Sequence, residues 1–373
     1  MTKWHVGIVG AGKIGVMIAA LLKESGDYTI AIFDQNEDAL KALKDVERVR
    51  IDVSDEDALA AALGNVDAVL SAAPFFLTPV IARAAKRSDT HYLDLTEDVS
   101  STNLVMDLAK DASSAFAPQC GLAPGFVSIA AHDLARKFDK LENLTLRVGA
   151  LPRYPTNRLK YNLTWSTEGL INEYCNPCLA IVDGTLTEVA PLEGLETFSL
   201  EGVDYEAFNT SGGLGSLHET LRGKVNSLKY LSIRYPGHRE IISLLLQDLG
   251  LKNRRDLLKE VMETALPTTK QDVVVVFITA SGMIDGRLEE RSYLNEINAG
   301  QIAGTHWSAI QITTAAGICA TLDMIREGRL AKSGFIKQED IPLEAFLANR
   351  FGALYLGHRS IQDNGEPKLL AAE

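Results

Sequence analysis

The sequence is poor in the features that mark several large classes of protein. Its 373 residues include only 4 cysteines, too few for a disulfide framework in a chain of this length. Its longest strand-like apolar run, Val273–Ile278, is far shorter than the roughly 18 residues that a membrane span needs. The formal net charge is −12, and no basic cluster is present that could bind a phosphate backbone. We therefore expect a globular protein with no membrane and no nucleic-acid partner.

Targeting and metal-binding signals are also scarce. Residues 1–5 run directly into an apolar strand, which leaves no room for a signal peptide and predicts a cytoplasmic protein. Cys175 and Cys178 have the Cys-x-x-Cys spacing, but no second cysteine pair or histidine pair completes a tetrahedral zinc site. No metal ion is therefore expected.

The strongest positive signal lies in the first strand and the turn that follows it. Residues 6–15 read Val-Gly-Ile-Val-Gly-Ala-Gly-Lys-Ile-Gly, an apolar strand that runs into Gly-x-Gly-x-x-Gly. Gly10 permits a tight turn, Gly12 lets the backbone approach a pyrophosphate, and Gly15 lets the next helix press onto the sheet. The free N–H groups at the start of that helix then face the phosphates. This pattern predicts a dinucleotide site.

Asp34 ends the second predicted strand and indicates which dinucleotide binds. Its carboxylate can accept hydrogen bonds from ribose hydroxyls and would repel a 2′-phosphate. Gln35 and Asn36 add no cation that could offset this repulsion, so we expect NAD in preference to NADP. The residues predicted to surround NAD are Gly10, Gly12, Lys13, Ile14, Gly15, Asp34, Asp52, Ser71, Ala72, Ala73 and Pro74.

The first 120 residues alternate strand and helix patterns, and later residues do not. The rhythm predicts an α/β fold, a Rossmann doubly wound parallel sheet with ligands at the carboxyl ends of its strands. A Gly/Pro turn at 120–125 marks a crossing into an α+β domain on a mixed sheet. The chain also exceeds what one hydrophobic core usually supports. We expect an NAD-binding domain at 1–122, an α+β substrate-binding and dimerisation domain at 123–308, and C-terminal helices at 309–373 that return to the first domain.

The same Val273–Ile278 run bears on oligomeric state. It is apolar on both faces of a strand, more than a sheet covered on one side needs. We expect a homodimer or larger homo-oligomer in which a second subunit covers part of this strand. A strand buried between layers of one chain is the alternative.

Several segments of the second domain combine glycines, hydroxyls, aromatics and single charges. They are Cys-Gly-Leu-Ala-Pro-Gly at 120–125, Thr-Trp-Ser-Thr-Glu-Gly-Leu-Ile-Asn-Glu-Tyr at 164–174, Thr-Ser-Gly-Gly at 210–213 and Ile-Arg-Tyr-Pro-Gly-His at 233–238. With the N-terminal fingerprint, they resemble the saccharopine dehydrogenase and lysine 6-dehydrogenase family over residues 4 to about 350. The resemblance implies chemistry on the carbon–nitrogen bond at the ε position of lysine, as the free amine or as its adduct saccharopine.

Oxidation of an amine needs a hydride acceptor, an uncharged nitrogen and a group that takes the ammonium proton. His238 is the leading candidate for that group, because it shares a loop with Arg234 and histidine titrates near neutrality. A capping or core histidine would give the same pattern, and His218 and His306 are rivals. Cys120 ends the sixth predicted strand near the expected nicotinamide position, although a buried packing thiol fits equally well.

The substrate itself needs a partner for its ammonium and one for its carboxylate. Asp94 and Glu97 lie at the tip of the fifth predicted strand and could hold the ammonium, with helix capping by Asp94 as the alternative. An arginine can clamp a carboxylate through two parallel hydrogen bonds, or form a surface salt bridge instead. The arginine candidates are Arg153, Arg158 and Arg234, with Arg234 best placed by its motif.

Four further residues complete the predicted substrate site. Thr210 and Ser211 offer hydroxyls beside two glycines, suited to a carboxylate or amide, although a plain loop has the same sequence pattern. Tyr161 and Trp165 could wall the aliphatic part of the substrate or simply pack in the core.

Three functions remain compatible with these features. The first is an NAD-dependent lysine 6-dehydrogenase, which forms an imine that water hydrolyses to the semialdehyde and ammonia. The second is saccharopine dehydrogenase or reductase, whose larger substrate brings additional carboxylates and needs extra cations. The third is a non-catalytic NAD-binding regulator. The intact glycines and Asp34 favour use of the cofactor, and the polar loops of the second domain argue against a scaffold.

Overall fold

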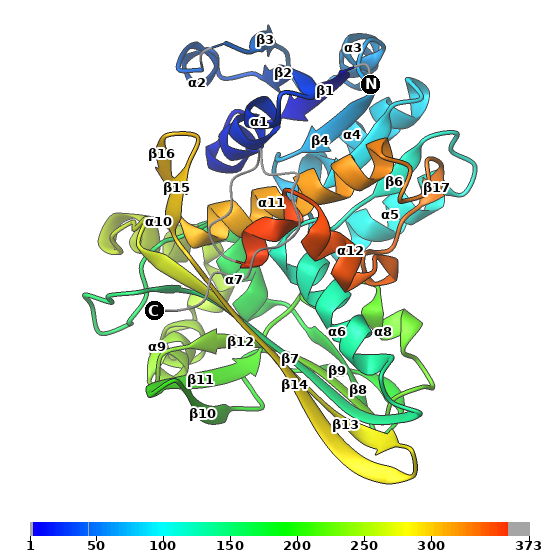
Figure 1. The fold of residues 1–373 in the computed structure, drawn as a ribbon. Coiled ribbons are helices and arrows are strands. Elements are labelled where there is room, and N and C mark those ends of the chain that lie inside the picture. Colours follow the sequence, from blue (N-terminus) through cyan, green and yellow to red (C-terminus); the bar gives the residue numbers. More distant parts are fainter. Residues whose placement is uncertain (1–2, 44, 357–373) are drawn as a thin grey trace.

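The computed structural model describes residues 3–43 and 45–356 (Figure 1). The end of the predicted C-terminal part, 357–373, lies outside the described residues. No helix of the described part is long and apolar enough to cross a membrane.

The first domain is a seven-stranded parallel sheet in the order β17-β6-β5-β4-β1-β2-β3. The prediction of a doubly wound α/β sheet is thereby confirmed. Its strands are β1 (Trp4–Val9), β2 (Tyr28–Asp34), β3 (Glu47–Arg50), β4 (Ala68–Ser71), β5 (His91–Asp94), β6 (Ala115–Ala117) and β17 (Gly334–Phe335). Its helices are α1 (Lys13–Ser25), α2 (Glu37–Lys41), α3 (Glu56–Leu63), α4 (Thr78–Arg87) and α5 (Val99–Ala109).

Alternating residues of these strands build two separate cores, one on each face of the sheet. Ile30 and Ile32 of β2 pack on one face with α1, whereas Ala31 and Phe33 pack on the other face with α3 and α4. A parallel sheet buried on both faces has this character. The carboxyl ends of β1, β4 and β5 lie in register, since Ser71 of β4 pairs with both Val9 of β1 and Asp94 of β5.

The second domain is a mixed sheet in the order β10-β11-β12-β7-β13-β14, with β8 and β9 attached to β12. Its strands are β7 (Lys140–Pro152), β8 (Cys178–Val182), β9 (Thr185–Val189), β10 (Glu196–Leu200), β11 (Val203–Asn209), β12 (Ser227–Arg234), β13 (Asp272–Ile284) and β14 (Arg287–Asn298). Its helices are α6 (Val127–Ala135), α7 (Thr167–Cys175), α8 (Leu217–Thr220), α9 (His238–Ser243) and α10 (Arg255–Ala265). Pairing of β12 with β7 is parallel, and the other pairs are antiparallel.

The remaining elements are a hairpin, two helices and several short helical turns. They are the hairpin β15 (Gly300–Ile302) and β16 (Thr305–Trp307), helices α11 (Ala309–Arg326) and α12 (Leu343–Ala348), and short helical turns at Phe75–Leu77, Leu122–Phe126, Leu244–Asp248, Leu251–Asn253, Gln338–Asp340 and Gly352–Leu356. Figure 1 shows α11 between the first domain and the second sheet, where it contacts both α1 and β13. A Cβ atom on Gly317 of α11 would lie 2.3 Å from the Cys120 carbonyl oxygen, so only glycine permits this approach. After α11 the chain returns to the first sheet and adds β17 beside β6.

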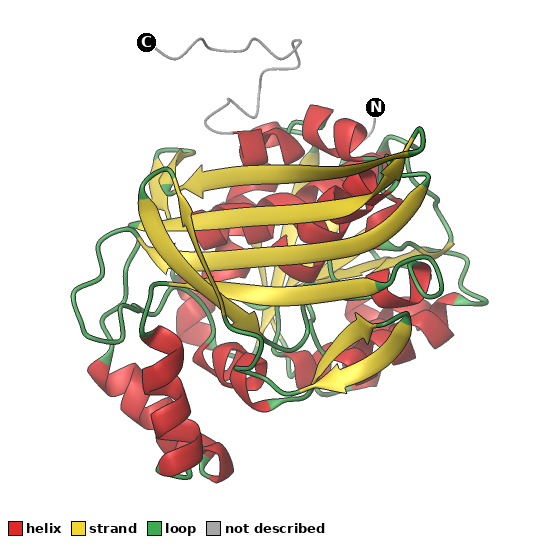
Figure 2. Cartoon of the chain, turned by 90° about the horizontal axis from the view of Figure 1, so that it is seen from below, coloured by secondary structure: helices red, strands yellow, loops and turns green. Residues whose placement is uncertain are grey.

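The strand that suggested a dimer is already covered within one chain. Val273, Val274, Val275, Val276 and Ile278 are all buried in the described structure. Residues of β13 face two cores, one shared with α11 and one on the opposite side of the sheet. Figure 2 shows this sheet in front of the helices. The apolar run therefore does not by itself require a second subunit, and the homodimer stays a prediction.

Candidate functional site

The glycine loop rests directly on the end of β4. Gly10 has φ +107°, and a Cβ atom there would lie 2.9 Å from the Ala72 carbonyl oxygen. A Cβ atom on Gly15 would lie 1.9 Å from the Gly10 carbonyl oxygen. A Cβ atom on Gly12 would meet nothing within 4 Å, so the protein leaves open space in front of this residue. Helix α1 begins here with no side-chain cap and no acidic residue in its first turn, which fits the binding of phosphates.

Asp34 braces this loop from the end of β2. Its carboxylate accepts hydrogen bonds from the N–H of Ala11, at 2.7 Å, and from the N–H of Asn36, at 2.8 Å. Arg50 of β3 lies opposite Asp34 in the strand register and forms an ion pair with Glu37 at 3.3 Å. The residues that follow Asp34 in the sequence give no sign of this cation, because Arg50 comes from the neighbouring strand.

The other predicted cofactor residues occupy the same edge of the sheet or its rim. Ser71 is buried at the end of β4, and the N–H of Ala72 donates to the Val9 carbonyl, which fixes the segment 71–74 beside the glycine loop. Asp52 is exposed, and hydrogen bonds from the hydroxyl and N–H of Ser54 hold its pKa below the usual value. Lys13 and Ile14 form the first turn of α1.

Asp94 and Cys120 are buried among hydrogen-bond partners of the protein itself, and their contact with substrate stays a prediction. Asp94 is buried and accepts hydrogen bonds from the Tyr92 hydroxyl and from the N–H groups of Thr96 and Gln119. Burial raises the pKa of Asp94 to about 6. The Cys120 thiol is also buried, 3.0 Å from the Ala117 carbonyl oxygen, and burial raises its pKa. Such fully enclosed groups fit the packing and bracing alternatives better than contact with substrate.

Arg234, the last residue of β12, forms the centre of a buried cluster. Its Nε donates to the Tyr174 hydroxyl at 2.7 Å, and its Nη1 donates to the Ile233 carbonyl at 2.8 Å. Its Nη2 lies 3.3 Å from Oε2 of Glu173. The guanidinium carbon lies 5.4 Å and 5.6 Å from the ring centres of Tyr161 and Tyr174, within the range of cation–π contacts. Buried partners therefore hold Arg234 in a fixed position. Arg234 does not form the surface salt bridge that was the alternative.

His238 belongs to the same cluster, but both of its ring nitrogens are engaged. Nε2 lies 2.9 Å from the Tyr174 hydroxyl, and Nδ1 lies 2.9 Å from the Leu159 carbonyl oxygen. The carbonyl can only accept, so Nδ1 carries the proton and Nε2 accepts from Tyr174. Burial, followed by the charge of Arg234, lowers the pKa of His238 to about 3. This environment favours a neutral histidine that orients Tyr174, and proton acceptance from the substrate stays a prediction.

Two glutamates from different domains interact with each other, and one of them pairs with Arg234. Glu173 of α7 pairs with Arg234, and burial raises the pKa of Glu173 to about 7. Glu97, three residues beyond the end of β5, interacts electrostatically with Glu173 and lies against Gly212 of the second domain. The sequence analysis considered Glu97 for the ammonium but did not single out Glu173. The only signal for Glu173 in the sequence was its place in the motif at 164–174.

The predicted loop and wall residues adjoin this cluster. The Ser211 N–H donates to the Glu173 carbonyl at 3.0 Å, and the hydroxyls of Thr210 and Ser232 lie 2.7 Å apart. The Trp165 indole N–H donates to the Tyr161 hydroxyl at 3.1 Å. Tyr161 is fully buried, whereas Trp165 is only partly buried. The structure therefore brings the substrate candidates of motifs 161–174, 210–213 and 233–238 together.

Other candidates lie outside the cluster. Arg153 and Arg158 are exposed, and Arg153 bonds to Asn298 of β14. His218 contacts the Gly215 carbonyl oxygen, and His306 contacts that of Lys270. No group of three or more possible metal ligands is present among the described residues.

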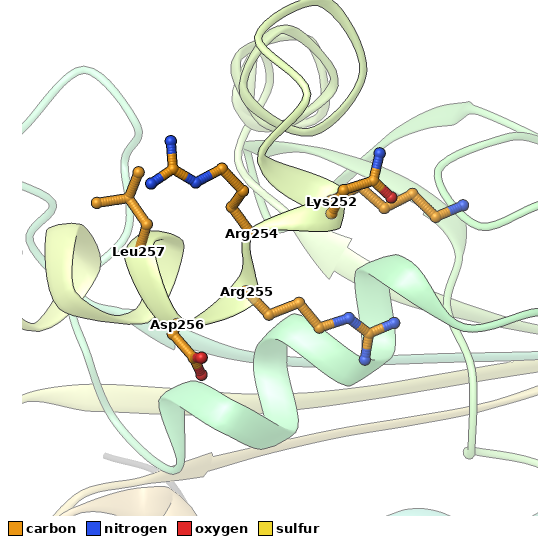
Figure 3. Close-up of a pocket in the computed structure, with 6 residues that line it drawn as sticks. Lys252, Arg254, Arg255, Asp256 and Leu257 are labelled. Carbon is orange, nitrogen blue, oxygen red and sulfur yellow. The ribbon is translucent and has the colours of Figure 1, made fainter.

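Figure 3 shows a surface hollow lined by Lys252, Asn253, Arg254, Arg255, Asp256 and Leu257. These residues are consecutive, so the hollow surrounds one turn at the start of α10. Arg255 is already bonded to Asn172 of α7 and to Asn176, which follows that helix. The glycine loop and the Arg234 cluster contribute no residue to the hollow.

The comparisons with known proteins agree with this arrangement. Residues 6–120 match the saccharopine dehydrogenase NADP binding domain, and residues 121–351 match the saccharopine dehydrogenase C-terminal domain. A mitochondrial alpha-aminoadipic semialdehyde synthase of Rattus norvegicus is 24% identical over 276 residues, which are 68% of this chain and 29% of that protein. The chain thus spans less than a third of the length of this relative.

Two further relatives are covered more completely. Saccharopine dehydrogenase [NADP(+), L-glutamate-forming] of Pyricularia oryzae is 24% identical over 349 residues, 85% of this chain and 75% of that protein. The solved apo structure of saccharopine dehydrogenase (L-Glu forming) from Saccharomyces cerevisiae is 16% identical, with a TM-score of 0.75, over 92% of this chain and 97% of that one. This structure supports the fold, and the two family matches together show that the chain belongs to the saccharopine dehydrogenase family.

Proposed function

We propose that this protein is an NAD(P)-dependent dehydrogenase that oxidises the C–N bond of an amino-acid amine, with the lysine ε-amine as the favoured substrate. The observation that carries the proposal is the buried pair of Arg234 and Glu173, together with a second glutamate, Glu97 of the nucleotide-binding domain, that interacts electrostatically with Glu173. The cation could bind the carboxylate of an amino acid, and the glutamates could bind an ammonium group.

The glycine loop, the start of α1 and Asp34 would hold the cofactor, because they combine open space, free N–H groups and a carboxylate for the ribose. A bound nicotinamide accepts a hydride from the substrate carbon. We propose NAD as the preferred cofactor, on the basis of Asp34. The position of Arg50 and the name of the NADP binding domain family support NADP as the alternative.

Arg234 would clamp the substrate carboxylate. A guanidinium has five N–H groups, and the hydrogen bonds described here use three of them. Two N–H groups therefore remain for a carboxylate. The cation–π contacts with Tyr161 and Tyr174 restrain the guanidinium group, so the clamp would be preorganised.

The number of arginines favours lysine over saccharopine. Within the described residues the cluster holds one buried arginine, Arg234, while Arg153 and Arg158 are exposed. One cation suits a substrate with one carboxylate, whereas saccharopine carries further carboxylates that would need partners. Saccharopine remains the second candidate, because a relative of known name that aligns over most of this chain acts on it.

The test is the formation of reduced nicotinamide with lysine, saccharopine and a diamine that lacks the carboxylate, with each cofactor in turn. We expect lysine to give reduced cofactor and ammonia in equal amounts, and the diamine to react with a much higher KM. Product formation from saccharopine without ammonia release, and none from lysine, would reassign the substrate. No reduction with any of the amines would contradict the proposed activity.

A further inference from the structure

Glu97 occupies a point where the two domains touch. It follows β5 in a short loop whose neighbours are fixed, since Asp94 accepts the N–H of Thr96, and Asp98 caps α5 by accepting the N–H of Ser101. Opposite Glu97 lies Gly212 of the second domain, which has φ +91°. A Cβ atom on Gly212 would lie 3.2 Å from the Cβ of Glu97 and 3.4 Å from its Oε2. The carboxylate therefore projects along the 210–213 loop.

The carboxylate of Glu97 has no partner of its own. Within residues 3–43 and 45–356, no hydrogen bond or ion pair reaches it, and the side chain is only partly buried. The neighbouring carboxylates differ in this respect. Asp94 accepts three hydrogen bonds, and Asp98 accepts from Ser100 and Ser101. Glu97 is thus the carboxylate of this loop that is left to interact with a ligand.

The charges that face Glu97 come from the second domain. Glu173 of α7 opposes it, and Tyr230 of β12 lies close enough to interact electrostatically with both glutamates. Arg234 compensates Glu173 but forms no bond to Glu97 in the described structure. Burial, followed by the charge of Glu173, holds the pKa of Glu97 well above its usual value. A carboxylate in this setting gains a proton more readily than an exposed one.

We propose that Glu97 accepts the proton that the substrate ammonium loses before hydride transfer, a role that rests on the proposed function. The nitrogen of R–CH₂–NH₃⁺ gives one proton to the Glu97 carboxylate. The carbon then loses a hydride to NAD(P)⁺, which leaves R–CH=NH₂⁺ and NAD(P)H. Water converts the iminium ion to the aldehyde and ammonium, and Glu97 returns its proton to solvent. The neutral nitrogen supplies the electron pair that the departing hydride requires.

The other titratable groups near the cluster suit this role less well. His238 is enclosed and has both nitrogens engaged. Asp94 already accepts three hydrogen bonds, and the buried Cys120 thiol contacts Gln338. Glu173 is neutralised by Arg234 and therefore binds a proton less readily than an unpaired carboxylate in the same place.

The experiment compares the full-length protein with its Glu97→Gln and Glu97→Asp variants over a range of pH. Glutamine keeps the size of the side chain but cannot take a proton, so we expect kcat for amine oxidation to fall by about 10²-fold or more. The acid limb of the kcat/KM profile should disappear in Glu97→Gln and remain in Glu97→Asp. Titration with NAD(P)H should show nearly unchanged cofactor binding. Glu219→Gln, an exposed glutamate on α8, serves as the matched control.

The outcomes separate two questions. An active wild-type protein whose Glu97→Gln variant keeps its rate, or loses rate while the acid limb stays in place, overturns the role of Glu97. A wild-type protein that reduces neither cofactor with lysine, saccharopine or the diamine overturns the proposed function instead. Loss of the acid limb together with retained cofactor binding supports the proposal, because a purely structural glutamate would not control that limb.

Discussion

The two halves of the candidate site differ in whether backbone or side-chain groups form them. The half in the first domain consists largely of backbone, with Gly10, Gly12 and Gly15 shaping a loop that the Asp34 side chain supports. The half in the second domain consists of interlocked buried side chains centred on Arg234. A backbone site recognises a group that all dinucleotides share. A site made of side chains can change by single substitutions, which suits the half that we propose to select the amine.

The largest effect is expected where the side-chain half is most tightly connected. Arg234→Lys replaces a planar fork by a single ammonium group, which cannot contact Tyr174, Ile233 and Glu173 together and still clamp a carboxylate. We expect kcat/KM to fall by about 10²-fold to 10³-fold, mainly through a higher KM. Steady-state kinetics with the reactive amine measures this.

Arg153→Lys is the matched comparison for that variant. Arg153 is exposed and bonds to Asn298, so we expect its replacement to leave KM nearly unchanged. An increased KM in Arg153→Lys and a normal KM in Arg234→Lys would move the carboxylate clamp to Arg153. Thermal unfolding of both variants shows whether either change acts through the fold.

Two glycine substitutions in the backbone half should have distinguishable effects, one on folding and one on cofactor binding. A Cβ atom on Gly15 would meet the Gly10 carbonyl oxygen at 1.9 Å, so Gly15→Ala should displace α1 and destabilise the domain by about 1–3 kcal/mol. A Cβ atom on Gly12 meets no protein atom within 4 Å. Gly12→Ala should therefore fold normally and bind the cofactor at least about tenfold more weakly. Normal cofactor affinity in Gly12→Ala would place the pyrophosphate elsewhere.

The contrast between the halves also explains what the sequence could predict. The glycine spacing and Asp34 belong to one contiguous βαβ unit, so local pattern was sufficient to predict the doubly wound sheet. Glu173 and Arg234 meet across 61 positions of the chain, and Glu97 comes from the other domain. Such a meeting is a property of topology, which residue spacing does not encode.

The missed strands have a related cause. The sequence analysis did not predict β10, β11, β12 or β14. In β14 most side chains from Arg287 to Asn298 are at least partly exposed, because it forms the edge of the sheet, so no apolar pattern marks it. In β12 the polar residues Ser232 and Arg234 point into the buried cluster, which disguises the strand. Buried polar residues thus obscure the pattern of a strand where they take the place of apolar core residues.

A smaller effect should reveal how the two dinucleotides are distinguished. Asp34→Ala removes the carboxylate that we propose binds the ribose and repels a 2′-phosphate. Hydrogen bonds to charged groups contribute about 1.5–3 kcal/mol, so the NAD to NADP ratio of kcat/KM should fall by about tenfold to a hundredfold. The ratio is the useful measure, because loss of the bond to Ala11 weakens both cofactors.

Arg50→Ala tests the opposite contribution. Arg50 stands beside Asp34 and pairs with Glu37, and its removal should raise the ratio if it attracts a 2′-phosphate. A strong NAD preference that survives in Asp34→Ala would show that another feature of the loop sets the choice.

The smallest expected effect concerns His238, where two roles predict different results. Its pKa is lowered from 6.5 to about 3, so between these values the unfolded chain binds a proton that the native chain does not. Stability should therefore fall as the pH drops through this window, by up to about 1.4 kcal/mol per pH unit. Glu173, with a raised pKa of about 7, has the opposite sign and contributes less as the pH rises from 4.5 to 7.

His238→Asn should consequently flatten the acid side of the stability curve, measured by urea unfolding at a series of pH values, and Glu173→Gln should flatten the neutral side. If His238 only orients Tyr174, its replacement should lower kcat by no more than about tenfold, and the acid limb of the rate profile should be preserved. A fall of about 10²-fold with that limb lost would instead make His238 the proton acceptor. Catalysis would then depend on the rigid side-chain half of the site alone, and Glu97 would be left as a contact between the domains.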